Sequence, residues 1–148
     1  PSPKKRFAMT STAPKRIAVV CTIYRYLSHA QHFADRFLVG YPYEGRWRRP
    51  DMEVVSLYVD QKPQGDQSQD RAREFGFEVY PTIAETLRCG GDELAVDAVL
   101  IIGEHGDPSL HNARPAVQFC CRKMNGAAVP LIAVSHSLFV RIQPRIFW

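Results

Sequence analysis

Residues 16–38 constrain the fold of this chain most strongly, because they join a buried strand directly to a capped helix. Ile17–Val20 is a short run of apolar and β-branched residues, typical of a strand buried on both faces. Ser28 and Gln31 form a capping box, which predicts that a helix begins at Ser28. The apolar stripe of that helix consists of Ala30, Phe33, Ala34, Phe37 and Leu38. This order predicts the first half of a β-α-β unit.

Strands and helices are expected to alternate from this unit to about Asp107. The expected strands are Glu53–Val59, Phe77–Tyr80 and Val96–Ile102. The expected helices are one through Arg71, Ala72 and Phe75 that stops at Gly76, and one that opens at the Thr82/Glu85 capping box and closes at Gly90-Gly91. The first helix is expected to stop at Gly40. This alternation, with nearly continuous apolar strands, predicts an α/β fold: a Rossmann-like three-layer α/β/α domain with a mainly parallel sheet.

Bulk properties indicate an ordinary globular chain of 148 residues, of which 45% are hydrophobic. No apolar run approaches the ~20 residues that span a membrane, and the N-terminus lacks the apolar stretch of a secretory signal. We therefore expect a cytoplasmic protein. None of its cysteines forms a Cys-x-x-Cys pair, which favours free thiols over disulfides or zinc. They are Cys21, Cys89, Cys120 and Cys121.

Charge is divided unevenly along the chain. Residues 1–107 carry 14 basic and 15 acidic residues, whereas residues 108–148 carry five basic residues and no acid. Residues 1–15 are rich in Pro, Ser, Thr and Lys and are expected to form a disordered basic arm, with Met9 a plausible start of translation. The basic character of the chain therefore belongs to its tail, and residues 16–107 are the expected folded domain.

From Arg16 to about Asp107 the order of elements resembles the N-terminal domain of the Gfo/Idh/MocA oxidoreductases. The strand, turn and helix of 16–38 carry this resemblance, together with two further stretches. One is Val54–Asp60 followed by the helix that ends at Gly76 and by Val79-Tyr80-x-Thr82-Ile83-x-Glu85-x-Leu87; the other is Asp97–Ile102 followed three residues on by His105. The resemblance implies a Rossmann domain that binds NAD or NADP.

The chain departs from this family at several positions. The glycines of the family's G-x-G-x-x-G turn fall on Cys21, Ile23 and Tyr26, which cannot provide the tight turn or the close approach to a pyrophosphate. The family's Glu-Lys-Pro, with its catalytic lysine, is absent, and the second, substrate-binding domain is absent too. We therefore expect an incomplete oxidoreductase that is not active by itself, and we assign no catalytic residue.

The expected cofactor site lies at the ends of three strands. Asp60 ends the second strand and could accept hydrogen bonds from an adenosine ribose, although a solvated loop aspartate is an equal alternative. An acid at this position favours NAD over NADP. The insertion at 41–50 places Asp60 further from the first turn than the usual ~20 residues. The other candidate residues are Thr22, Ile23, Tyr24, Arg25, Ser28, Gly103, Glu104 and His105.

Two interpretations of the first turn stay open. Arg25 and the helix N-terminus at Ser28, with free N–H groups, could hold a phosphate. Alternatively, Tyr24 and Tyr26 fill the ligand's place or pack against the aromatic insertion, which we favour because a bulky turn blocks the backbone from the ligand. At the last strand, His105 is a possible general base, and a structural loop histidine is the better interpretation.

Other side-chain groups give weaker signals. His29 and His32 lie one helical turn apart, but the sequence offers no third ligand, so we expect no metal site. Trp47 with its neighbouring arginines resembles a nucleic-acid patch. Because the body of the chain is slightly acidic, we expect a solvated loop or a subunit contact there instead. We expect no membrane contact, and the oligomeric state stays open.

Two interpretations of residues 108–148 also stay open. In one, Ala116–Met124 is a helix and Val129–Val134 is a fifth strand, which continues the Rossmann pattern. In the other, the native reading frame is lost near Asp107, as the abrupt loss of acids and the Cys120-Cys121 pair suggest. The source DNA decides between them. A different function class also remains: a non-enzymatic binding or assembly module whose Tyr/Arg-rich turn replaces the dinucleotide site.

Overall fold

A computed structural model describes residues 13–103, 106–107 and 131–135 of the chain. The expected N-terminal arm falls mostly outside the described residues, and its last residue, Lys15, already belongs to the first strand. The helix expected at 116–124 lies outside them as well, as do Cys120 and Cys121.

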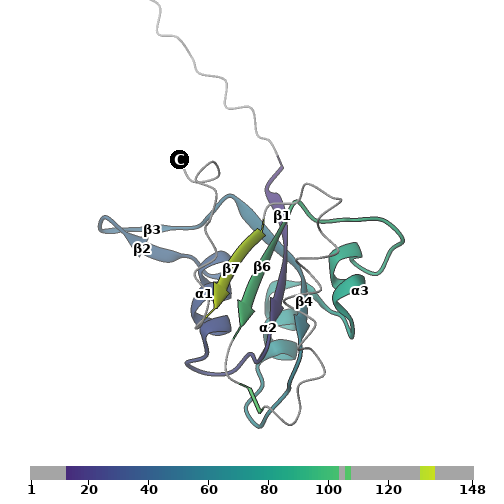
Figure 1. The fold of residues 1–148 in the computed structure, drawn as a ribbon. Coiled ribbons are helices and arrows are strands. Elements are labelled where there is room, and N and C mark those ends of the chain that lie inside the picture. Colours follow the sequence, from purple (N-terminus) through teal and green to yellow (C-terminus); the bar gives the residue numbers. More distant parts are fainter. Residues whose placement is uncertain (1–12, 104–105, 108–130, 136–148) are drawn as a thin grey trace, which may run out of the picture.

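Five parallel strands form the central sheet (Figure 1). Their order in the sheet is β5-β4-β1-β6-β7, and every neighbouring pair is parallel. The strands are β1 (Lys15–Cys21), β4 (Met52–Val59), β5 (Glu78–Val79), β6 (Ala98–Gly103) and β7 (Leu131–Ser135). The first strand is central and the chain moves outward on both sides of it, which is the 3-2-1-4-5 strand order of a Rossmann fold. The predicted fold class is thereby confirmed. Of the two interpretations of residues 108–148, one expected a fifth strand at Val129–Val134, and β7 occupies most of that range.

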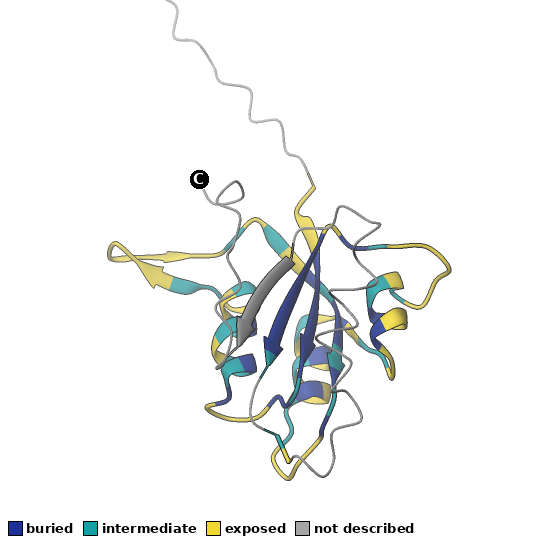
Figure 2. Ribbon diagram, viewed as in Figure 1, coloured by how far each residue is buried: buried dark blue, intermediate teal, exposed yellow. Residues whose placement is uncertain are grey.

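Alternate residues of β1 face two different apolar layers, because side chains of a strand point to opposite faces. Ile17 and Val19 pack in one cluster with the buried faces of α1 (His29–Leu38) and α2 (Ser68–Phe75). Ala18 and Val20 pack in a second cluster with α3 (Ile83–Arg88). The buried sheet therefore lies between two helical layers, as Figure 2 shows by its dark strands.

The predicted helix starts are confirmed by hydrogen bonds. Ser28 Oγ accepts from the Gln31 backbone N–H at 3.2 Å, and Thr82 Oγ1 accepts from Glu85 N–H at 3.2 Å. The end of α3 differs from the expectation of a Gly90-Gly91 stop. Cys89 takes the left-handed C-cap position, with φ of 49°, so a residue with a Cβ begins the turn and Gly90 continues it at 78°.

The aromatic insertion after α1 is a β-hairpin and not a simple loop. It pairs β2 (Tyr41–Tyr43) with β3 (Arg46–Arg48) in antiparallel register. Both turn residues have positive φ, 48° at Glu44 and 70° at Gly45, as a type I′ hairpin turn requires. The hairpin leaves the sheet at the start of β4, so it lengthens the sequence before Asp60 without moving Asp60 from the end of that strand (Figure 1).

Candidate functional site

The candidate site lies at the carboxyl edge of the sheet, over β4, β1 and β6. Backbone hydrogen bonds join the three strand ends there: Asp60 N–H donates to Cys21 O at 3.0 Å, and Thr22 N–H donates to Ile102 O at 3.2 Å. The strands β4 and β5 lie on one side of β1, and β6 and β7 lie on the other side, so the strand order reverses between β1 and β6 and this edge is the topological switch point. Ligands of open α/β sheets bind at this location.

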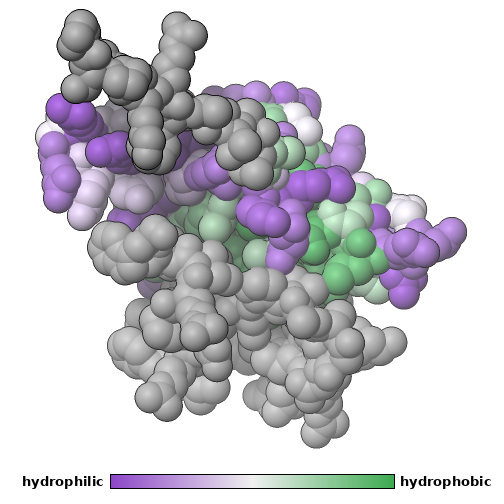
Figure 3. Space-filling model, turned by 90° about the horizontal axis from the view of Figure 1, so that it is seen from above, coloured by the Kyte–Doolittle hydropathy of each residue, from purple (hydrophilic) through white to green (hydrophobic). Residues whose placement is uncertain are grey.

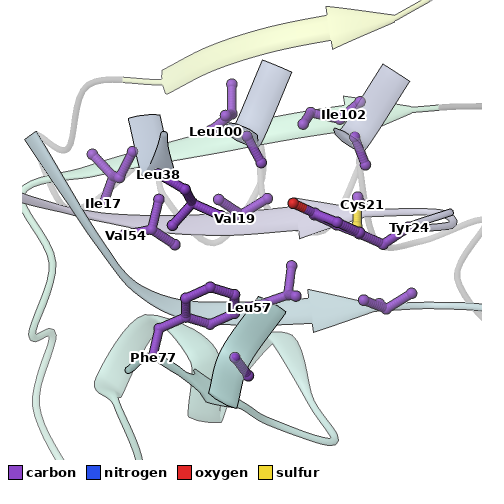
Figure 4. Packing of buried hydrophobic residues seen from close by; sticks show 14 of the residues in the cluster. Ile17, Val19, Cys21, Tyr24, Leu38, Val54, Leu57, Phe77, Leu100 and Ile102 are labelled. Carbon is purple, nitrogen blue, oxygen red and sulfur yellow. The ribbon is translucent and has the colours of Figure 1, made fainter. Parts of the chain in front are cut away.

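The turn after β1 sends its two tyrosines in different directions. Tyr24 is buried, with 1% of its surface exposed, and packs beside Cys21 in the cluster under α1 (Figure 4). Tyr26 is 70% exposed. Of the other expected site residues in this turn, Ile23 and Ser28 are buried, and Arg25 is exposed. Tyr24 therefore belongs to the core and Tyr26 to the surface, and the expected packing of both against the hairpin is not what the structure shows.

The hydroxyl of buried Tyr24 is satisfied by a carboxylate of α1. It donates to Asp35 Oδ1 at 2.8 Å, and Arg71 of α2 donates to Asp35 Oδ2 at 2.7 Å. Burial, and then the negative charge of Asp35, raise the pKa of Tyr24 well above its usual range. This hydroxyl consequently stays protonated near neutral pH and donates to α1 through Asp35, which in turn joins α1 to Arg71 of α2.

Backbone N–H groups at the start of α1 are used within the chain. Ser28 Oγ accepts from Arg25 as well as from Gln31, and Ser28 N–H donates to Arg25 O at 3.0 Å. Leu27 N–H donates to Gln31 Oε1 at 2.6 Å, which holds Leu27 at a φ of 60°. The amides of Arg25, Leu27, Ser28 and Gln31 are therefore already hydrogen-bonded within the chain.

The turn is also tied to the loop before α2. Gln67 N–H donates to Tyr24 O at 2.8 Å, and Arg25 forms a β-bridge with Asp66. A glycine-free turn of this length thus follows one defined path, because its two sides are hydrogen-bonded to α1 and to the loop before α2.

Asp60 occupies the position that the sequence predicts, at the carboxyl end of β4. The Tyr58 hydroxyl donates to Asp60 Oδ1 at 3.1 Å, which orients the carboxylate at the edge. Burial, and then the hydrogen bond to Asp60, raise the pKa of Tyr58 to about 12. The sequence signals this contact only through spacing. Tyr58 and Asp60 are two positions apart, and this spacing places both side chains on one face of an extended chain.

This pKa predicts a loss of stability at high pH. The folded state holds the Tyr58 proton more tightly than the unfolded chain, whose tyrosine pKa is about 10. The stabilisation is complete below pH 10 and is lost as pH rises to about 12. We expect Tyr58→Phe to reduce the slope of unfolding free energy against pH in this window, measured by urea denaturation. The exposed Tyr26→Phe variant is the control, and equal slopes for wild type and Tyr58→Phe would contradict the assignment.

Gln61 was not expected in the site, yet it joins two sides of the edge. Its buried side chain donates from Nε2 to Asp107 O at 3.1 Å and accepts at Oε1 from Asp107 N–H at 2.9 Å. A Cβ on Gly106 would lie 2.4 Å from Gln61 Oε1, so a larger residue there would displace the Gln61 amide from these hydrogen bonds. Gln61 therefore fixes the backbone that follows β6 above the end of β1. Glu104 and His105 lie outside the described residues, whereas Gly103 ends β6 at the same edge.

Metal-ligating side chains do not cluster in the described part of the chain, where no group of three or more His, Cys, Asp or Glu could hold an ion. His29 is half-buried and His32 is exposed on α1. Cys21 and Cys89 are free thiols. Among the described residues, no helix is long and apolar enough to cross a membrane.

The chain was compared with family models, curated proteins and solved structures, and none of them matches it.

Proposed function

We propose that this chain is a Rossmann-type domain that binds NAD at the carboxyl edge of its sheet, as the nucleotide-binding part of a Gfo/Idh/MocA-like oxidoreductase. The observation that supports it is the position of Asp60, at the end of the strand next to β1 in a sheet of Rossmann order. An acidic residue at this point accepts hydrogen bonds from the ribose hydroxyls of an adenosine. The same negative charge repels a 2′-phosphate, so NAD is preferred over NADP.

The diphosphate would be held differently from that of a glycine-rich turn. Amides around Ser28 are already hydrogen-bonded, so Arg25, which is exposed on the turn, supplies the positive charge instead. Thr22 lies directly after β1, and Gly103 ends β6 on the other side of the switch point. Glu104 and His105 follow Gly103 in the sequence. The buried side chains of Ile23 and Tyr24 anchor the turn in the core and do not face the ligand. Because the chain has no Glu-Lys-Pro motif, the proposal concerns cofactor binding and assigns no catalytic residue.

Isothermal titration calorimetry of the full chain with NAD tests the proposal. We expect Asp60→Ala to weaken NAD binding about tenfold or more, since a hydrogen bond to a charged group contributes about 1.5–3 kcal/mol. NADP should bind more weakly than NAD to the wild type, and Asp60→Ala should narrow that difference.

Asp70→Ala is the matched control, because Asp70 is an exposed acid on α2 whose partner is Arg73 of the same helix. It should leave the NAD affinity unchanged. An absence of heat with millimolar NAD, or equal affinities of wild type and Asp60→Ala, would reject the proposal.

A second candidate function is a non-enzymatic binding or assembly module. Two observations favour it: the capped start of α1, and the Gln61 side chain bound to Asp107 across the edge. Both use polar groups that a dinucleotide site would direct at its ligand. Under this alternative the wild type gives no heat with NAD, and Asp60→Ala changes neither ligand binding nor association.

A further inference from the structure

The β2–β3 hairpin (residues 41–48) projects from the amino edge of the sheet, opposite the candidate site (Figure 1). This hairpin is called the arm from here on, and it is distinct from the expected N-terminal arm of residues 1–15. Its register places Tyr41 opposite Arg48 and Tyr43 opposite Arg46. Directly opposed residues share one face of a ribbon, so one face of the arm carries two tyrosines and two arginines. Tyrosine, tryptophan and arginine are the residue types that dominate the energy of protein interfaces.

The arm is anchored to the end of α1 although it is exposed. Trp47 Nε1 donates to Val39 O at the end of α1, at 3.0 Å, while 63% of the Trp47 surface remains exposed. Arg49 Nε donates to Phe37 O at 3.4 Å, and the tight turn closes the other end. A side chain that is held in place and still exposed loses little conformational entropy on binding. The arm could therefore bind a partner surface at a low cost in conformational entropy.

Arginines of the arm have no acidic partner among the described residues, where no ion pair includes Arg46 or Arg48. Exposed acids without an ion pair there include Glu44 in the turn of the arm, Asp51 and Glu53 beside the start of β4, and, in the loop between α3 and β6 at the same amino edge, Asp92 and Glu93. Leu94, beside them, is 46% exposed. The arm and this loop therefore offer complementary charge, each with exposed apolar surface.

The two surfaces lie at opposite ends of one face. Seen from above, hydrophilic residues lie on the side of the arm and on the side of α3, and the surface between them carries hydrophobic residues together with further hydrophilic ones (Figure 3). The arm therefore points away from the acidic loop of its own chain. A second copy, turned by a two-fold rotation, would place its own acidic loop beside the arm.

We propose that the amino edge binds a second copy of this chain, with the arm of each copy on the loop of residues 92–94 of the other. Such an interface is self-complementary and closes as a dimer. The body supports this choice of occupant, since residues 13–107 carry 11 basic and 15 acidic residues. A nucleic acid could stack on the same rings, but this acidic body would repel its phosphates. The carboxyl edge stays open in the dimer, so the inference is independent of NAD binding.

Light scattering coupled to size-exclusion chromatography of the full chain tests the dimer. We expect a dimer at low salt that weakens as salt rises, because the Debye length falls from about 30 Å at 0.01 M to about 8 Å at 0.15 M. Arg46→Glu with Arg48→Glu, and separately Asp92→Lys with Glu93→Lys, should each raise the dimer dissociation constant about tenfold or more. Mixing the two double variants should restore a dimer, since both contacts again join opposite charges.

Lys62→Glu, an exposed charge reversal at the carboxyl edge, is the control and should leave the dimer intact. Circular dichroism checks that each variant is folded. A wild type that is monomeric at low salt, or a mixture of variants that stays monomeric, would overturn the proposal. So would a wild type that binds a labelled single-stranded oligonucleotide as a monomer through Arg46 and Arg48, which would assign the arm to nucleic acid.

Discussion

Replacing Tyr24 by alanine is expected to lower the free energy of unfolding by about 3–5 kcal/mol, the cost of truncating a fully buried aromatic side chain. Tyr24 is 1% exposed, and its ring fills the space between the end of β1 and α1 (Figure 4). The variant also removes a donor to the half-buried Asp35 carboxylate. Urea denaturation followed by circular dichroism measures the change.

Tyr26→Ala provides a control two residues away in the same turn. Because Tyr26 is 70% exposed, this variant should change the unfolding free energy by no more than about 0.5 kcal/mol. Tyr24→Phe keeps the ring and removes the hydroxyl, so it should lose only about 1–2 kcal/mol. If Tyr24→Ala were as mild as Tyr26→Ala, the turn would not be anchored in the core as described.

Replacing Asp35 by alanine is expected to lower the free energy of unfolding by about 2–3 kcal/mol. Asp35 accepts from Tyr24 of the turn and from Arg71 of α2, and the side chains of Asp35 and Arg71 are each 21% exposed. Removing Asp35 leaves the buried Tyr24 hydroxyl without its acceptor and leaves Arg71 with Glu74, to which Arg71 Nη1 donates at 2.9 Å, as its remaining charge partner. The partial exposure of the pair reduces the cost of that loss. Arg71 Nε is itself buried without a hydrogen-bond partner in the described structure.

Asp70→Ala removes a comparable ion pair at the surface. Asp70 pairs with Arg73 within α2, and both side chains are largely exposed, so the expected loss is about 0–1 kcal/mol. A double-mutant cycle of Asp35→Ala and Tyr24→Phe should show coupling, since the two side chains are hydrogen-bonded. Additive effects, or an Asp35→Ala variant as stable as Asp70→Ala, would contradict the role of Asp35 as the link between turn and helices.

Much of the fold could be predicted because its signals are local. The capping boxes at Ser28 and Thr82 and the stop at Gly76 each depend on residues within one helical turn, and the structure confirms all three. The apolar strands likewise predicted a parallel sheet. The hairpin at 41–48 was missed, because its strands are only three residues long and carry polar and aromatic side chains on exposed faces.

The candidate site could be predicted in part. Asp60 was located from strand order alone, and β1 still pairs with β4 in the register that brings Asp60 to the edge. The direction of Tyr24 could not be predicted, because it depends on Asp35 eleven positions away and on Arg71 in another helix. The use of the α1 amides depends in the same way on how the turn folds back on Ser28.

By itself the sequence determined the alternation of strands and helices, the ends of α1 and α2, and the place of Asp60 after the second strand of the sheet. Periodicity and capping decide these features within a few residues. Only the tertiary structure decided that the glycine-free turn is anchored through Tyr24, and that Gln61 binds the backbone of Asp107, 46 positions away. Such contacts follow from the packing of the sheet, which brings distant segments to one edge, and no local pattern in the chain encodes them.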